Sequence, residues 1–283
     1  MTRKTAGEDS EPRFLRMVDR LLGGAPARAV ENRYVMAAAR IVAALALPFA
    51  RMGRVSVVIV NWNTLPYLRE TLGALRRFSD APLEVIVVDN GSTDGSVEFL
   101  RAAPGLRRIC LRRNVGHAAA LDLGFLAASS EIVLALDVDA FPIKASWLES
   151  IVSPLRRGCA VSGVRLWRPY AHPCCMAMRK ARFVLRRHTF RARYSSDREK
   201  LGRTAWDVGE SISMRETGST GGVNLVPLTS QRGPGDVGTV FGDCVYHNFY
   251  SARHQKGRGP IDGVSAEDAA RAWEEAVRLY LRE

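Results

Sequence analysis

The sequence predicts an α/β protein with a mostly parallel β-sheet flanked by helices. Runs rich in β-branched residues begin at residues 55, 83, 106 and 131, so they recur at a nearly constant interval. These runs are continuous rather than alternating, which is typical of strands covered on both faces. Stretches with helical character lie between them. Strands and helices that alternate in this way form βαβ crossovers, which place neighbouring strands parallel.

Four strands and the helices that connect them can be predicted in order. The strands are "VSVVIV" at 55–60, "LEVIVVD" at 83–89, "LRRICL" at 106–111 and "EIVLALD" at 131–137. After the first strand, Leu68, Leu72 and Leu75 share one helical face. A short helix is expected at 97–102 and a long apolar helix at 118–128.

The segments outside this alternating region are expected to be an N-terminal extension, a second half of the same domain and a C-terminal helix. The expected divisions are residues 1–53, 54–155, 156–264 and 265–283. In the second half, a strand is predicted at 160–166. Ser265 and Asp268 form a capping pattern, and the apolar residues that follow indicate an amphipathic helix.

The basic N-terminal extension has helical potential at 14–22 and 32–47. A helix packed on the main domain is favoured over an interfacial membrane anchor. The longest uncharged apolar run, 41–50, is too short to span a bilayer, and the first residues lack the apolar core of a secretory signal. The five cysteines have no paired zinc spacing and are expected to be reduced thiols. We therefore expect a cytoplasmic protein, with a peripheral contact on the inner membrane face as an open alternative.

The positive charge of the chain suits partners that carry phosphate. The chain has 41 basic and 29 acidic residues, a net charge of +12, and ten of the basic residues lie between Arg179 and Arg203. Charge alone does not choose among nucleotides, nucleic acids and an anionic membrane face. Because no zinc-finger or RNA-recognition signature accompanies the basic residues, we expect no nucleic-acid partner.

Polar clusters follow each predicted strand at the point where it ends. They are "NWN" at 61–63, "DNGSTDGS" at 89–96, "RRNVGHAAA" at 112–120 and "DVD" at 137–139. Ligands of parallel sheets bind beyond the carboxyl ends of the strands, so these clusters should face one crevice. Asp137 and Asp139 can both reach one hard divalent cation, directly or through water. Such a triplet is a weak signal by itself and gains weight from its place among the strand ends.

The four segments "VSVVIVNWN", "VIVVDNGSTDGS", "NVGHAAALDLGF" and "LALDVDAF" resemble, in this order, the signature segments of the family 2 glycosyltransferases. The resemblance covers about residues 55–155 and is loose beyond them. It implies a GT-A type, Rossmann-like fold with a nucleotide-sugar-binding half and an acceptor-binding half. It also implies inverting transfer from a nucleotide-diphosphate sugar, for which we expect UDP or dTDP, with Mg²⁺ or Mn²⁺ held by the aspartates.

The resemblance also assigns nucleotide-sugar-binding residues. These are Asn61, Asn63, Asp89, Ser92, Asn114, Gly116, Asp137 and Arg253. A carboxylate such as that of Asp89 can accept hydrogen bonds from a base imide or a ribose hydroxyl. Gly116 permits close approach of the backbone to the nucleotide. Arg253 lies in a basic segment that could close over the diphosphate. His117 is interpreted as a capping or packing residue and is left out of the site.

For the metal, the resemblance assigns Asp139 as a direct ligand and Asp137 as a contact to the ribose or, through water, to the metal. His247, in "VYHNFY", is expected to complete the metal shell or to touch the diphosphate, with a packed histidine as the alternative.

Inverting transfer needs a carboxylate that takes the proton of the acceptor hydroxyl. The candidate is Asp207 in "AWDVGES", where the Glu-Asp pair common in the family is missing. Its alternative role is that of a helix N-cap. Trp167, Tyr170 and His172 are expected to line the acceptor site.

The acceptor remains open among a glycan, a lipid-linked sugar and a small metabolite, and an anionic or lipid-linked acceptor would suit the basic run. Because the Glu-Asp pair is absent, a second hypothesis stays open: a nucleotide-sugar-binding protein of this fold without catalytic activity.

Overall fold

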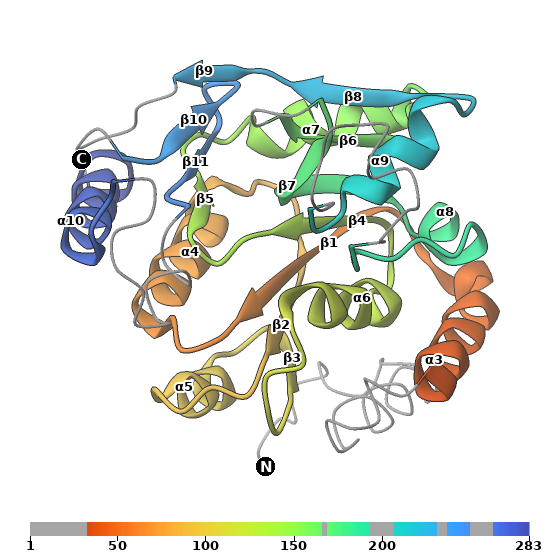
Figure 1. Cartoon of the computed structure of the whole chain (residues 1–283), viewed down its shortest axis with the longest axis horizontal. Coiled ribbons are helices and arrows are strands. Elements are labelled where there is room, and N and C mark those ends of the chain that lie inside the picture. Colours follow the sequence, from red (N-terminus) through yellow and green to blue (C-terminus); the bar gives the residue numbers. More distant parts are fainter. Residues whose placement is uncertain (1–32, 166–168, 193–206, 231–236, 250–262, 283) are drawn as a thin grey trace, which may run out of the picture.

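The computed structural model describes residues 33–165, 169–192, 207–230, 237–249 and 263–282 of the chain. Its centre is a seven-stranded sheet in the order β3-β2-β1-β4-β7-β6-β8 (Figure 1). The strands are β1 (Arg51–Asn61), β2 (Glu84–Asp89), β3 (Leu106–Cys110), β4 (Ser130–Leu136), β6 (Val161–Arg165), β7 (Ala171–Arg179) and β8 (Val223–Val226). Strands β1 to β4 pair in parallel, which confirms the predicted α/β class with a mostly parallel sheet.

The sheet differs from the sequence prediction in the start of β1 and in two strands, β7 and β8, that were not predicted. Strand β1 begins at Arg51, before the predicted start at residue 55, because Arg51 also pairs with Ser130 across a register shift. Strand β7 was not predicted as a strand at all. It runs antiparallel between β4 and β6, and its sequence "AHPCCMAMR" contains none of the β-branched residues that favour strands. Burial between two neighbours, rather than intrinsic propensity, makes this segment a strand.

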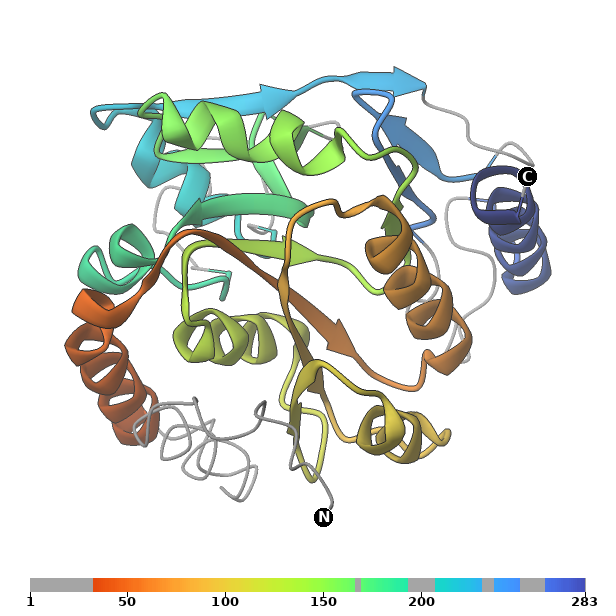
Figure 2. The ribbon, with the colours of Figure 1, turned by 180° about the vertical axis from the view of Figure 1, so that it is seen from behind.

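Helices cover both faces of the sheet (Figures 1 and 2). One face carries α6 (His117–Ala127), with α3 (Arg33–Leu45) and α8 (Lys180–Leu185) beside it. The other carries α4 (Leu65–Phe78), α5 (Ser96–Ala102) and α7 (Trp147–Arg156). Helix α3 packs against α6 and α8, as expected for a helix at 32–47 that packs on the main domain. The helix expected at 14–22 lies outside the described residues.

A second, antiparallel sheet lies beside the carboxyl end of the main sheet. It consists of β5 (Ala140–Pro142), β11 (Val245–His247), β10 (Thr239–Phe241) and β9 (Leu228–Ser230), in that order. The C-terminal helix α10 (Ala266–Val277), which continues as η5 (Arg278–Arg282), packs Trp273 against Phe141 of this sheet. The predicted capping by Ser265 and Asp268 is confirmed. Among the helices that the structure describes, none has the length and apolar character needed to cross a membrane.

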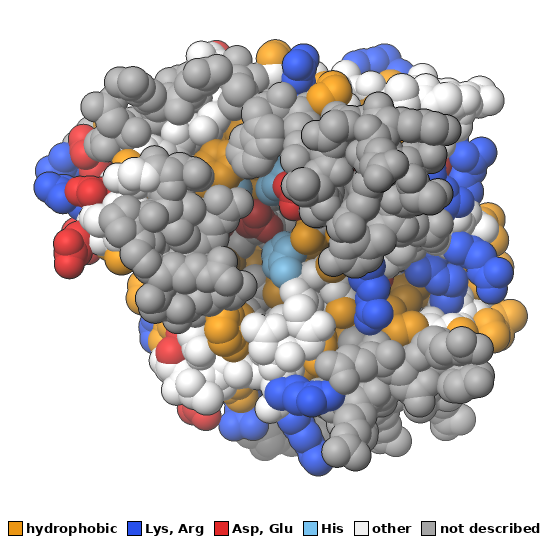
Figure 3. Space-filling model, in the orientation of Figure 1, with side chains coloured by type: hydrophobic (Ala, Val, Ile, Leu, Met, Phe, Trp, Pro, Cys, Tyr) orange, Lys and Arg blue, Asp and Glu red, His pale blue; other side chains and the backbone are white. Residues whose placement is uncertain are grey.

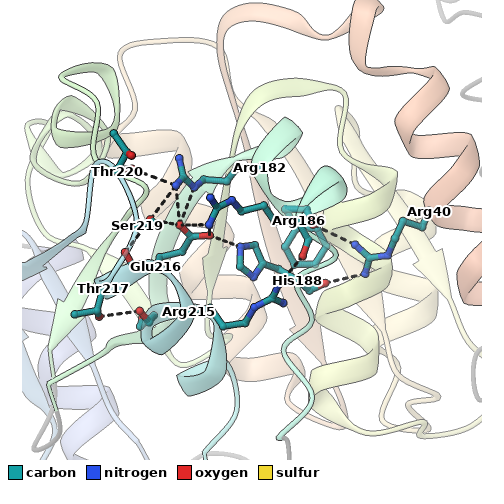
Figure 4. A network of polar contacts seen from close by, with 11 residues as sticks. Arg40, Arg182, Arg186, His188, Arg215, Glu216, Thr217, Ser219 and Thr220 are labelled. Carbon is teal, nitrogen blue, oxygen red and sulfur yellow. Dashed lines mark hydrogen bonds and ion pairs between the residues drawn. The ribbon is translucent and has the colours of Figure 1, made fainter.

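The helices α8 and α9 (Glu210–Thr217) are joined by a buried ionic network around Glu216 (Figure 4). The carboxylate of Glu216 accepts a hydrogen bond from Arg182 Nε at 2.9 Å and lies 2.6 Å from His188 Nε2. Ser219 Oγ donates to it at 2.5 Å, and Arg186 Nη1 lies 3.4 Å away. Because the Glu216 carboxylate is fully buried, removing its charge would leave Arg182 and Arg186 without their partner.

We expect Glu216→Gln to lower the free energy of unfolding at neutral pH by about 3 kcal/mol, because it breaks a buried ion pair from one side. Burial alone would raise the pKa of Glu216, but hydrogen bonds from Arg182, Ser219 and His188 outweigh it and lower that pKa to about 2. A carboxylate whose pKa is lowered in the folded state stabilises the fold at pH values above its ordinary pKa. The difference between wild type and variant should therefore shrink as the pH falls from about 4.5 towards 2.

Urea unfolding at pH 7 and at acidic pH measures this difference. Glu149→Gln is the matched control, because it removes only an exposed ion pair and should change stability by less than about 1 kcal/mol. Equal losses of stability in the two variants would contradict the stabilising role assigned to Glu216.

Candidate active site

The ends of β1 and β2 are joined by a hydrogen-bonded cluster of predicted nucleotide-site residues. In the ladder, Asn61 is paired with Asp89, so their side chains leave the sheet at the same edge. Asn61 Nδ2 donates to Asp89 Oδ1 at 2.8 Å and to Ser92 Oγ at 3.1 Å. The Ser92 backbone N–H donates to Asp89 Oδ2 at 3.0 Å, and that of Asn63 donates to Ser92 Oγ at 2.9 Å. The four residues hold the two loops together and lie beside the cavity rather than in its lining.

A second pair of amides joins β2 to the start of α6. Asn90 Nδ2 donates to Asn114 Oδ1 at 3.0 Å, and Asn90 Oδ1 accepts from the backbone N–H of Val115 at 2.9 Å. Asn114 Oδ1 also accepts from the Gly116 N–H at 2.8 Å. Gly116 precedes α6 with a φ of +92°, a conformation that L side chains rarely adopt. Asn114 and Gly116 line the cavity as predicted, and so does Asn90, which the sequence analysis did not select.

Asp137, Asp139 and His247 come together below these loops. Each offers one ligand atom, and these atoms lie within 4.8 Å of one another. His247 Nε2 is 3.4 Å from Asp137 Oδ2 and 3.3 Å from Asp139 Oδ1. The reason is the second sheet: β11 pairs with β5, and His247 lies opposite Ala140, next to the acidic triplet. The backbone N–H of Asn248 donates to the Asp139 carbonyl at 2.9 Å and extends this contact.

The electrostatics of this group depend on burial and on mutual contact. Burial would raise the pKa of Asp137, but hydrogen bonds and charge from His117 and His247 lower it well below its usual range. Burial would likewise lower the pKa of His247, and the neighbouring carboxylates contribute to raising it well above its usual range. Without a cation, a protonated imidazole therefore balances the two carboxylates. A divalent cation would displace that proton, since metal-bound imidazole is neutral.

The donor set fits a hard cation such as Mg²⁺ or Mn²⁺. It provides two carboxylates and one imidazole, and oxygen ligands are those that Mg²⁺ and Mn²⁺ prefer. Oδ1 of Asp137 is buried and makes no hydrogen bond of good geometry, although His117 Nε2 lies 3.3 Å away. Buried polar atoms without a partner are uncommon in folded proteins. A bound cation or substrate group would satisfy this atom.

Asp207, Tyr170 and His172 form the opposite side of the site. Tyr170 is almost fully buried, and its hydroxyl donates to Asp207 Oδ2 at 2.8 Å. His172 Nε2 lies 4.0 Å from the same oxygen. Burial lowers the pKa of His172 to about 4, so its imidazole is neutral at neutral pH. Asp207 does not cap α9, because the N-cap is Gly209. The capping interpretation of Asp207 is therefore wrong. Tyr170 and His172, which were predicted to line the acceptor site, both lie next to Asp207.

One cavity of about 430 Å³ connects these groups. Figure 3 shows it as a hollow with acidic and histidine side chains at its centre. Its walls include the predicted residues Asn114, Gly116, Asp137, Asp139, His172, Asp207 and His247, together with Trp62, Thr64, Asn90 and His117. A larger hollow of about 890 Å³ between α4 and α10 contains none of the motif residues. Trp167 and Arg253 lie outside the described residues.

His117 is the site residue that sequence reasoning set aside. It is the first residue of α6, and its Nε2 lies 3.3 Å from Asp137 Oδ1. The available signal was its position: a side chain just after Gly116, at the start of a helix that follows a strand end, faces the same crevice as the acidic triplet.

The chain belongs to glycosyl transferase family 2. The model of this family matches residues 56–200, which is more than half of the chain. The resemblance found in the sequence motifs is thereby confirmed.

Curated relatives match over a short region. An uncharacterized glycosyltransferase of Nostoc sp. is 32% identical over 90 residues, 30% of this chain and 28% of the relative. Undecaprenyl-phosphate 4-deoxy-4-formamido-L-arabinose transferases of Yersinia enterocolitica and Serratia proteamaculans are 35% and 39% identical over 97 and 94 residues. These matches cover 31% and 30% of this chain, and 30% and 29% of the relatives. The matched region thus spans less than a third of each relative's length.

Solved structures with similar folds include the mannosyltransferase PcManGT of Pyrobaculum calidifontis in complex with GDP-Man and Mn²⁺. Its TM-score is 0.46 at 21% identity, over 74% of this chain and 66% of that one. Residues 1–349 of TarS from S. aureus give a TM-score of 0.44 at 19% identity, over 61% and 58% of the two chains.

If Asp137, Asp139 and His247 bind Mn²⁺, Asp139→Ala should weaken binding by at least about tenfold, because a carboxylate ligand is lost. Electron paramagnetic resonance of free Mn²⁺ measures the bound fraction. Asp80→Ala is the control, because Asp80 is an exposed loop residue. Equal Mn²⁺ binding by wild type and Asp139→Ala would exclude this metal site.

Proposed function

We propose that this protein is a metal-dependent, inverting glycosyltransferase that moves a sugar from a nucleotide-diphosphate donor to a hydroxyl acceptor. The observation that supports it most strongly is the convergence of Asp137, Asp139 and His247 opposite Asp207 in one cavity. A group that can hold a cation against a diphosphate and a carboxylate that can take a proton are the two chemical parts that such a transfer requires.

Asp137, Asp139 and His247 would hold Mg²⁺ or Mn²⁺. When bound, the cation supplies Lewis-acid stabilisation to the departing diphosphate. While no metal ion is bound, the positive charge of His247 would offset the repulsion between the carboxylates of Asp137 and Asp139. The same side chains would therefore keep the site formed before the donor arrives.

Asp207 would take the proton of the acceptor hydroxyl as its oxygen attacks the anomeric carbon. The Tyr170 hydroxyl holds Oδ2 at 2.8 Å, and the Val208 N–H donates to Oδ1 at 2.8 Å, so both carboxylate oxygens are oriented by hydrogen bonds. His172, neutral at neutral pH, adds a polar wall on the same side. These contacts would hold a base in the same cavity as the acidic triplet.

The donor would enter between Trp62 and the amide pair of Asn90 and Asn114. Asp89 would receive hydrogen bonds from the base or ribose only after a small opening of its loop, because it is fully buried and both of its oxygens already accept hydrogen bonds. We propose UDP- or dTDP-sugars as donors. The names of the matched undecaprenyl-phosphate sugar transferases point to a lipid phosphate as the acceptor, which is the alternative to a hydroxyl acceptor.

A nucleotide-sugar-binding protein without catalytic activity is the second candidate. The observation that favours it is the sequence "AWDVGES", which places a single aspartate where the family commonly has a Glu-Asp pair. Release of nucleotide diphosphate from a sugar donor by the purified protein would exclude this candidate, because binding alone leaves the donor intact.

The donor class can be measured by calorimetry with UDP, GDP, CDP and dTDP, with and without Mn²⁺, on wild type and on Asp139→Ala. We expect metal-dependent binding of UDP or dTDP, weakened at least about tenfold in the variant. Asp80→Ala should bind as wild type does. Binding of no nucleotide to the wild type would overturn the proposed function.

Asp207→Asn should reduce turnover by about 10²- to 10⁴-fold and leave nucleotide affinity unchanged, because a general base acts in the transition state. Tyr170→Phe should have a smaller effect, since it loosens the base without removing it. A phosphate acceptor already carries an anionic oxygen and needs no base. Wild-type turnover of Asp207→Asn would therefore remove both the base and the hydroxyl acceptor from the proposal.

A further inference from the structure

The outer face of α3 is apolar where a surface helix normally carries polar side chains. Ile41 and Leu45, one turn apart, are 61% and 67% exposed. From Met36 to Leu45 the only charged residue is Arg40, and it turns inward. Its guanidinium donates to the backbone carbonyls of Phe183 at 3.1 Å and His188 at 2.7 Å. The helix therefore uses Arg40 to attach to α8 and to the segment after it, and presents the apolar Ile41 and Leu45 to solvent.

The apolar face continues beyond the end of α3. Phe49 in η1 (Leu47–Phe49) is 80% exposed, and Met52 at the start of β1 is 75% exposed. We call Ile41, Leu45, Phe49 and Met52 the α3 ridge. Leu185, at the end of the adjoining α8, is also exposed. These five account for most of the large exposed hydrophobic side chains in the part of the chain that the structure describes, the other two being Met214 and Leu279.

The two segments that form the α3 ridge and its surroundings are rich in basic residues and contain no acidic ones. Residues 36–54 and 180–192 contain eight lysines and arginines and no aspartate or glutamate: Arg40, Arg51, Arg54, Lys180, Arg182, Arg186, Arg187 and Arg191. Within them, Lys180 is buried and Arg182 and Arg186 face Glu216 of α9. From outside them, Glu131 of β4 accepts a hydrogen bond from the Gly53 N–H. Arg51, Arg54 and Arg187 are exposed. Figure 3 shows basic and hydrophobic side chains side by side at the right-hand edge, where Figure 1 places α3 and α8.

We propose that the α3 ridge docks on an anionic phospholipid membrane. An apolar face buried at the boundary between headgroups and acyl chains, flanked by arginines that reach the phosphates, is the arrangement by which interfacial helices bind lipid. The exposed Arg51, Arg54 and Arg187 give this surface the charge complementary to such a membrane.

Two other occupants fit the surface less well. A symmetric contact with a second copy would bring the same arginine-rich segments against each other, because a two-fold interface uses one patch twice. Residues 1–32 carry six basic and five acidic residues, so their net charge does not complement the arginines.

Docking through the α3 ridge would couple the membrane to the acceptor side of the candidate active site. Beyond α8, the Phe190 carbonyl accepts from the Gly209 N–H at 2.9 Å, two residues from Asp207. The Phe190 N–H and the Thr189 hydroxyl donate to Asp122 of α6, the helix whose first turn lines the cavity. The proposed docking is inferred from the residues of this surface and does not rest on the proposed function. A lipid-linked acceptor would occupy the same bilayer.

Flotation of the full chain with vesicles tests the proposal. The probes are vesicles of phosphatidylcholine and vesicles of phosphatidylcholine mixed with phosphatidylglycerol. We expect wild type to bind the anionic vesicles and to lose binding as salt rises. Ile41→Ser/Phe49→Ser should weaken partitioning by at least about tenfold, because two apolar side chains no longer enter the bilayer. Met214→Ser/Leu279→Ser is the matched control and should bind as wild type does.

Calorimetry with nucleotide and thermal unfolding of the ridge variant separate docking from folding and from the active site, and both should equal wild type. Absence of vesicle binding by wild type, or equal binding by wild type and the ridge variant, would overturn the proposal. A wild-type dimer in light scattering that the ridge variant converts to a monomer, without vesicle binding, would assign the ridge to a second copy and overturn it as well.

Discussion

The parallel pairing of β2, β1 and β4 is the constraint on which the rest of the structure depends. Both faces of these strands are covered by helices, so their backbone groups have to be satisfied within the ladder. Parallel strands in register end at the same edge, and Asn61 is paired with Asp89 there. Each chain crossover then returns a polar loop to this edge. The cavity is the space that remains between these loops and the second sheet.

The pairing of β5 with β11 completes the candidate metal site with a residue far along the chain. His247 lies opposite Ala140, which follows Asp139 directly. Two carboxylates held this close would repel each other, and the imidazole between them relieves the repulsion while no cation is bound. The site is therefore formed by the fold and does not have to assemble around a ligand. Helix α10, packed on the same small sheet, supports this geometry from outside.

The antiparallel half of the sheet positions the residues proposed for the acceptor side. Tyr170 directly precedes strand β7 and His172 lies near its beginning, where both meet Asp207. The network around Glu216 joins α8 to α9, so the segment that follows Asp207 is attached to the helix that adjoins the α3 ridge. The base of the proposed reaction and the proposed membrane surface are thus parts of one connected layer.

Much of the candidate site could be predicted from the sequence because its elements are local. The four runs of β-branched residues predict the parallel strands, and the polar residues directly after them predict Asn114, Gly116, Asp137 and Asp139 in one crevice. The motifs at these ends are also those that identify the family. A strand end and its loop are adjacent in the chain, so periodicity and composition describe both.

Contacts between distant segments were decided only by the tertiary structure. Strand β7 has no β-branched residue, and its strand conformation comes from two neighbours that no local pattern reveals. His117 belongs to the site because it lies next to Asp137. Asp89 is buried, with hydrogen bonds from Asn61 and Ser92. The inward turn of Arg40, which leaves the α3 ridge apolar, depends on the backbone carbonyls of Phe183 in α8 and His188 beyond it. The sequence by itself determined where strands end and which chemistry follows them; the three-dimensional packing decided which side chains meet, because those contacts join residues far apart in the chain.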